Sequence, residues 1–279
     1  MAYTYRLVDV FSDTAFLGNP VAVILGADGL SAEQMLSITR WMNLSETTFV
    51  HTPVVEGADY GVRIFTLDRE LPFAGHPTLG SCAAWLSSLP DENTALEFTQ
   101  ACKAGLIRIR RDGDRFAFAA PPLLRTGRPS DEDIAEVCDF LNISRGDIAD
   151  VEWIDNGPGW LGVRLASAAD VLAVQPKAQY PRRIEIGLVG PWPAGSGRDF
   201  EVRALFSDQH GAVREDPVTG SLNAAVAQWL IATGQTDGRY VAGQGQAIGR
   251  DGRIEVSADD NDVWIGGSAR VIVSGRIEI

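Results

Sequence analysis

The spacing of hydrophobic and polar residues along the chain predicts short strands and a few helices. Apolar and polar side chains alternate over residues 3–8, and residues 20–25 form an apolar run bounded by turn-forming residues, so both segments are expected to be strands. Apolar residues recur with helical spacing from Ser31 to Asn43, where Ser31 and Gln34 form a capping pair. Strands are also expected at residues 46–51, 60–67, 107–119, 151–154, 160–166, 183–188 and 200–206.

The two halves of the chain resemble each other when they are offset by 140 residues. Val62 and Arg63 then fall on Val202 and Arg203, and Pro77 falls on Pro217. In each half a strand and a polar loop precede an apolar helix, expected at 77–89 and at 219–233. The pattern predicts two similar domains, residues 1–125 and 126–279, and the last strand has the option of pairing back onto the first domain.

The strands do not alternate regularly with helices, so the class expected is α+β with mostly antiparallel or mixed sheets. A proline- and glycine-containing linker is expected at 124–130. A helix is expected from Asp131 to Leu141, with Ser130 and Asp133 as its capping residues.

Composition and charge exclude several classes of function. The 279 residues carry 37 acidic against 24 basic side chains, a net charge of −13, which disfavours nucleic acid and anionic membrane surfaces as partners. The first residues have no leader pattern and no run approaches a membrane span, so a cytoplasmic location is expected. Three cysteines without CxxC spacing and three histidines without paired spacing predict free thiols and no metal site.

A glycine-rich stretch from Gly243 to Gly249 has the G-x-G start of a dinucleotide fingerprint. It is followed by a turn into a strand at 253–256 rather than by a helix, so a glycine-rich hairpin connection is expected instead. The chain also has no phosphate-binding loop of the GxxxxGK type. We therefore expect no nucleotide cofactor.

The two helix starts carry the candidate chemistry. Gly75-His76-Pro77 opens the first, and Asp216-Pro217 with Thr219-Gly220-Ser221 opens the second. Free backbone N–H groups and the partial positive charge of a helix N-terminus suit a carboxylate, so the amides of residues 219–221 are expected to bind an anion. His76 is expected to titrate near neutrality, and the simpler alternative is that these residues are ordinary caps.

Glu46 is the candidate acid/base. It begins an apolar strand directly after a helix, where partial burial would bring its carboxyl into the working range of a general base. The alternative is a solvated carboxylate at a strand end.

Four motifs together resemble the PhzF-like phenazine-biosynthesis family over the full chain. They are NPVAV at 19–23, SETTF at 45–49, LPFAGHPTLG at 71–80 and EDPVTGS at 215–221. The resemblance implies the diaminopimelate epimerase-like fold, in which two similar domains each wrap a mostly antiparallel sheet around a central helix, with the active site in the cleft between them. The family's founding member isomerises trans-2,3-dihydro-3-hydroxyanthranilate through a proton-shuttling glutamate.

By motif match, the resemblance implies that Glu46 is this glutamate and that His76 and Asp216 contact the substrate. It implies that Ser221 contacts the substrate as well, with Gly75, Thr219 and Gly220 supplying the surrounding backbone. Related racemases use two opposed cysteines at the helix starts, and here the nearest thiol, Cys82, lies inside an apolar helix. Residues 206–212 and 222–223 depart from the family pattern and are expected to border the cleft.

These observations predict a cofactor-free, metal-free isomerase of a small cyclic or amino-acid-like substrate that bears a carboxylate. Homodimerisation is implied by the resemblance alone. Two alternatives remain: a non-catalytic small-ligand-binding protein, and an amino-acid racemase or epimerase, which needs paired thiols.

Overall fold

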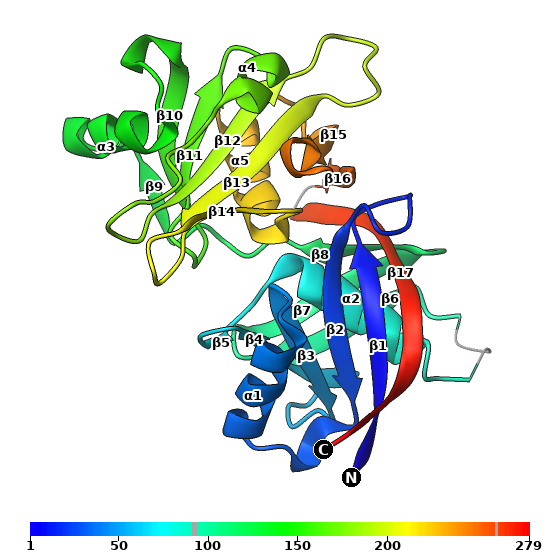
Figure 1. The fold of residues 1–279 in the computed structure, drawn as a ribbon. Coiled ribbons are helices and arrows are strands. Elements are labelled where there is room, and N and C mark those ends of the chain that lie inside the picture. Colours follow the sequence, from blue (N-terminus) through cyan, green and yellow to red (C-terminus); the bar gives the residue numbers. More distant parts are fainter. Residues whose placement is uncertain (91–93, 260–261) are drawn as a thin grey trace. The chain divides into compact units, whose positions relative to one another are not determined.

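A computed structural model describes residues 1–90, 94–259 and 262–279 (Figure 1). The chain divides into two compact units. Unit 1 consists of residues 1–119 together with 266–279, and unit 2 consists of residues 120–265. Residues 266–279 belong to unit 1 because the last strand, β17 (Val263–Glu278), pairs antiparallel with the first, β1 (Ala2–Val10), as Figure 1 shows in red and blue.

Unit 1 contains a ring of strands. Its order is β17–β1–β2–β3–β4–β6–β7–β8, and β8 pairs again with β17. The pairs β2–β3 and β4–β6 are parallel, and β5 pairs antiparallel with β4. The further elements are β2 (Asn19–Leu25), η1 (Ala27–Gly29), α1 (Ala32–Met42), β3 (Glu46–His51), β4 (Tyr60–Thr66), β5 (Glu70–Leu71), α2 (Gly75–Leu86), β6 (Glu97–Cys102), β7 (Gly105–Asp112) and β8 (Arg115–Ala119).

Helix α2 is the core of unit 1. Every residue from Gly75 to Ala84 is buried, and the helix packs against β1, β2, β3 and β8. Such burial suits a sequence that is apolar or small on all sides. A Cβ atom at Gly80 would lie 2.3 Å from the Cγ1 atom of Val21, so glycine is required where the helix meets β2.

From β10 to β16, unit 2 has the order of strands and α-helices that unit 1 has from β1 to β7, with α5 (Gly220–Ala232) in the place of α2. Its strands pair in the order β9–β10–β11–β12–β13–β15–β16, with β14 on β13. The elements are β9 (Arg125–Gly127), α3 (Asp131–Leu141), η2 (Arg145–Asp147), β10 (Ile148–Asp155), β11 (Leu161–Leu165), α4 (Ala168–Ala173), β12 (Glu185–Pro191), β13 (Phe200–Ser207), β14 (Val213–Asp216), β15 (Arg239–Gln244), η3 (Gln246–Ile248) and β16 (Gly252–Ala258).

The hydrogen-bonding pattern of unit 1 recurs in unit 2. In each, an antiparallel pair is followed by a parallel, an antiparallel, a parallel and a further antiparallel pair. The parallel steps are β2–β3 and β4–β6 in one unit and β11–β12 and β13–β15 in the other. The sheets are therefore mixed, with a few helices, and are compatible with the expected α+β class.

The helix boundaries reflect local capping. Ser31 and Ser130 each cap a helix through a capping box, as predicted, and α3 has the predicted bounds. The central helices begin at Gly75 and Gly220, close to the expected residues 77 and 219. Helix α4 was not anticipated, because six residues carry too little periodicity to separate a helix from a loop.

Candidate active site

Glu46 is the first residue of β3. The strand continues with buried residues from Thr47 to Val50, and only 15% of the Glu46 side chain is exposed. The carboxylate is thus largely withdrawn from water rather than solvated at a strand end. Because few water molecules reach it, polar and charged neighbours interact with this carboxylate more strongly than they would in water.

His76 is the neighbour of this carboxylate. It is the second residue of α2, its side chain is 4% exposed, and its Nε2 atom lies 3.3 Å from Glu46 Oε2. Burial lowers the pKa of His76 to about 3. The imidazole is therefore neutral at physiological pH, and the expectation that His76 titrates near neutrality is wrong.

Asn19 accounts for the orientation of the His76 ring. The Nδ2 atom of Asn19, at the start of β2, lies 3.3 Å from His76 Nδ1. When that amide donates to Nδ1, the neutral ring carries its proton on Nε2, on the side that faces Glu46. Sequence reasoning noted the NPVAV run but assigned no role to Asn19. A polar residue opening an apolar strand is the signal that could have shown it.

The second group of predicted residues lies in unit 2, around the start of α5. Asp216 ends β14, and the Thr219 hydroxyl donates a hydrogen bond of 2.5 Å to Asp216 Oδ2. The backbone N–H of Thr219 donates to Gln244 Oε1 at 3.0 Å. The expectation that this amide binds an anion is therefore wrong for Thr219. In the first turn, the amides of Gly220 and Ser221 lack intrahelical acceptors.

Ser221 is oriented by a loop that follows β10. Its Oγ atom accepts a hydrogen bond from Trp160 Nε1 at 3.2 Å, and its carbonyl oxygen accepts one from Asn156 Nδ2 at 2.8 Å. Because the hydroxyl oxygen is an acceptor for the indole, its own proton is available to donate. No spacing in the sequence links these two loop residues to Ser221, so they were missed.

The predicted residues therefore form two groups. Glu46, His76 and Gly75 come together in unit 1, where Gly75 is the first residue of α2. Asp216, Thr219, Gly220 and Ser221 come together in unit 2.

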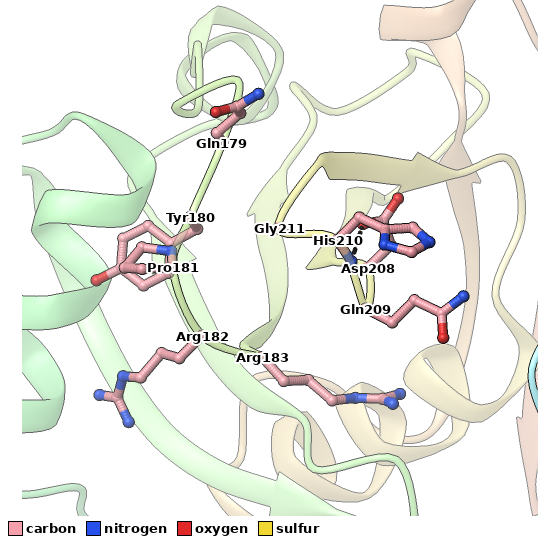
Figure 2. A pocket seen from close by; sticks show the side chains of 9 residues that line it. All are labelled: Gln179, Tyr180, Pro181, Arg182, Arg183, Asp208, Gln209, His210 and Gly211. Carbon is pink, nitrogen blue, oxygen red and sulfur yellow. Dashed lines mark hydrogen bonds between the residues drawn. The ribbon is translucent and has the colours of Figure 1, made fainter.

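The segments that depart from the family pattern have different surroundings. Residues 208–211 face residues 179–183 across a cavity of about 560 Å³ in unit 2 (Figure 2), and none of the predicted site residues lines it. Leu222 and Asn223 are wholly buried, and the Asn223 amide donates to Gln244 Oε1 and to the Thr219 carbonyl. Both side chains pack inside unit 2.

The cysteines are free thiols. Cys82 is fully buried in α2, and burial raises the pKa of its thiol to about 12. Within the described ranges, no three His, Cys, Asp or Glu side chains are grouped so that they could hold a metal ion. The described helices also include none that is both long and apolar enough to cross a membrane.

Comparison with known proteins identifies the family. The model of the phenazine biosynthesis-like protein family matches residues 8–276. The chain is 37% identical to antisense-enhancing sequence 1 of Schizosaccharomyces pombe, over 98% of both chains. It is also 37% identical to the trans-2,3-dihydro-3-hydroxyanthranilate isomerase of Pseudomonas chlororaphis, over 98% of this chain and 95% of that relative.

A crystal structure of a PhzF family phenazine biosynthesis protein from Enterococcus faecalis has the same fold. It matches with a TM-score of 0.80 at 24% identity and covers 100% of both chains. The names of the relatives confirm the prediction of an isomerase, and the family resemblance drawn from the four motifs is confirmed as well. The chain belongs to the phenazine biosynthesis-like, or PhzF, family.

Proposed function

We propose that this isomerase moves a proton between two carbon atoms of a small substrate by acid–base catalysis at Glu46. The substrate is cyclic or amino-acid-like and bears a carboxylate. The Glu46 carboxylate takes a proton from one carbon as that C–H bond breaks, and the Glu46 carboxyl then gives a proton to another carbon as a new C–H bond forms. The net change is the position of one proton and of a double bond, so no redox cofactor is needed.

The observation that carries the proposal is the buried contact between Glu46 and His76. A largely buried carboxylate is a stronger base than a solvated one, because burial disfavours its charged form. The neutral imidazole is a poor acceptor for that proton when its Nε2 atom already carries one. His76, whose Nε2 atom lies 3.3 Å from the Glu46 carboxylate, therefore leaves the proton on Glu46 until it passes to the substrate.

We assign substrate binding to the residues of unit 2. Asp216 contacts a polar substituent, and Ser221 with the amides of the first turn of α5 binds the carboxylate of the substrate. The helix-end partial charge and the donor hydroxyl both favour an anion, and neither depends on the net charge of the chain. Gly75 and Gly220 allow the backbone to approach the substrate closely.

A racemase mechanism with two thiols is disfavoured by the state of Cys82. The thiol is fully buried, and its high pKa leaves essentially no thiolate at physiological pH. The substrate of the Pseudomonas chlororaphis relative, trans-2,3-dihydro-3-hydroxyanthranilate, is the first compound to test.

The experiment compares the turnover of this compound by the unaltered chain and by three variants. Glu46→Gln should lower kcat by about 100-fold or more with little change in KM, because the amide cannot carry the proton. His76→Ala should lower kcat and raise KM together, because an orienting group acts on both binding and turnover. Glu97→Gln, whose side chain is 78% exposed on β6, is the matched control and should leave both unchanged.

Binding without conversion would contradict the proposal. A chain that holds the compound but neither converts it nor exchanges its protons with solvent would be a binding protein.

We further propose that units 1 and 2 are similar domains of the diaminopimelate epimerase-like type, supported by the repeated order of strand pairing. A homodimeric state and a cytoplasmic location complete the proposal, and sedimentation equilibrium tests the first.

A further inference from the structure

Gln244 lies at the end of β15 and is wholly buried beside the start of α5. Its carboxamide makes hydrogen bonds through both of its ends. The Oε1 atom accepts from the Thr219 N–H at 3.0 Å and from Asn223 Nδ2 at 2.8 Å. The Nε2 atom donates to the Asp216 carbonyl at 3.2 Å and to Thr219 Oγ1 at 3.0 Å.

Backbone groups fix the direction of every bond in this set. A backbone N–H can only donate, so the Gln244 atom that it meets must be the carbonyl oxygen. A backbone carbonyl can only accept, so the atom facing Asp216 must be the amide nitrogen. The Thr219 hydroxyl oxygen accepts from that nitrogen, which leaves its single proton for Asp216 Oδ2 at 2.5 Å.

We propose that Gln244 is a positioning residue that acts on Asp216 through Thr219. It directs the Thr219 hydroxyl towards the carboxylate, which keeps Asp216 ionised and restricts its side chain to one orientation. A hydrogen bond donated to the charged form of a carboxyl stabilises that form. The inference rests on the proposed function, because it assigns Gln244 to the residues that bind the substrate.

Two charged side chains near Asp216 are already paired with each other. Glu215, the preceding residue, forms a buried ion pair with Arg203 across β14 and β13, with a shortest N–O distance of 2.7 Å. Arg250 packs close to Gly245, beside the Pro217 carbonyl. None of these groups is altered in the variants below, and the variants add no charge, so these groups influence the titration of Asp216 equally in all of them.

The test is a titration of the Asp216 carboxyl carbon by ¹³C NMR in the full chain without substrate. Thr219→Val removes the hydroxyl at similar volume and should raise the midpoint by about one pH unit, the scale of one hydrogen bond to a charged group. Thr219→Ser keeps the hydroxyl and should leave the midpoint unchanged. Gln244→Met fills similar volume without a donor and without an added charge, which frees the Thr219 hydroxyl from its fixed orientation, and should raise the midpoint similarly.

Non-additivity distinguishes positioning from a general structural role. The double variant Thr219→Val/Gln244→Met should shift the midpoint no further than Thr219→Val does, because both changes remove the same bond and neither adds a charge. If Gln244→Met does not fold, Gln244→Leu takes its place, since leucine also lacks a donor and adds no charge. Folded Gln244 variants with the wild-type midpoint would overturn the proposal, as would a further shift in the double variant.

The same set of variants separates this inference from the proposed function. Turnover by Asp216→Asn tests whether Asp216 takes part in the reaction. If Asp216→Asn turns over the substrate at the normal rate, the proposed role of Asp216 in substrate binding is wrong. The NMR result then still decides whether Gln244 and Thr219 orient the Asp216 carboxylate. If the variant is inactive and the midpoints do not move, the positioning role fails and the site remains.

Discussion

Replacing Glu201 by glutamine should change how stability depends on pH. Glu201 lies on β13 and is wholly buried, and its Oε2 atom accepts hydrogen bonds from Trp192 Nε1 and Gln246 Nε2, both at 3.1 Å. Its Oε1 atom has no hydrogen-bond partner among the described residues. Burial raises the pKa of Glu201 from 4.5 to about 7, while the Trp192 hydrogen bond and Arg198 oppose this rise.

The sign follows from proton binding. The folded chain holds the Glu201 proton up to about pH 7, whereas the unfolded chain releases it near pH 4.5. Between these values the folded state binds more protons, so the free energy of unfolding falls as pH rises. The fall from pH 5 to pH 8 is about 2.5 kcal/mol for this group. Glu201→Gln removes this pH-dependent fall, because the amide stays neutral at every pH and its oxygen still accepts from both donors.

Urea unfolding at pH 5, 6, 7 and 8 measures the effect. Relative to the unaltered chain, the free energy of unfolding of Glu201→Gln should rise by about 2.5 kcal/mol between pH 5 and pH 8, with most of the rise present by pH 7. Glu56→Gln, on the exposed segment after β3, is the matched control and should follow the unaltered chain. Parallel curves for Glu201→Gln and the unaltered chain would refute the reasoning.

Three further predictions concern the core. Arg203→Met should lower the free energy of unfolding by about 3–5 kcal/mol, because it leaves the buried Glu215 carboxylate without its partner. Arg203→Met/Glu215→Leu should recover part of that loss in urea unfolding, because the Val171 and Val174 carbonyls still lose the hydrogen bonds that Arg203 donates. Gly80→Ala should lower the free energy of unfolding in urea by about 1–3 kcal/mol, because the added methyl group crowds β2. Gly146→Ala, whose added methyl group meets open space, should lower it by less than about 0.5 kcal/mol. Iodoacetamide at pH 8 should leave Cys82 unlabelled in the folded chain by mass spectrometry, and label it after unfolding.

Much of the fold could be predicted because local patterns and packing agree. The Ser130 cap and the acidic first turn specify α3 without help from the rest of the chain. The repeat at an offset of 140 was visible because Val62-Arg63 and Val202-Arg203 lie on equivalent central strands, where burial limits the choice of residue. The pairing of β17 with β1 could only be left open, because contacts between distant segments leave no local pattern.

The motifs identified the residues of the candidate site, but they did not show the protonation states or the hydrogen bonds of those residues. His76 was identified, yet its neutral form depends on burial by strands far away in the sequence. The Thr219 amide was assigned to an anion because nothing local showed that Gln244, 25 residues later, accepts its hydrogen bond. Asn19 and Trp160 contact His76 and Ser221 from distant parts of the chain, and such contacts leave no periodic pattern in the sequence.

Deuterium transfer from solvent tests the central claim most directly. In D₂O the unaltered chain should form product that carries deuterium at the carbon receiving the proton, because the protonated Glu46 side chain, 15% exposed, is expected to exchange its proton with solvent before it protonates that carbon. Mass spectrometry follows this incorporation with trans-2,3-dihydro-3-hydroxyanthranilate as substrate. Glu46→Gln should incorporate deuterium at least about 100-fold more slowly while still binding the compound. Incorporation by Glu46→Gln at the wild-type rate would contradict the assignment of Glu46 as the group that moves the proton.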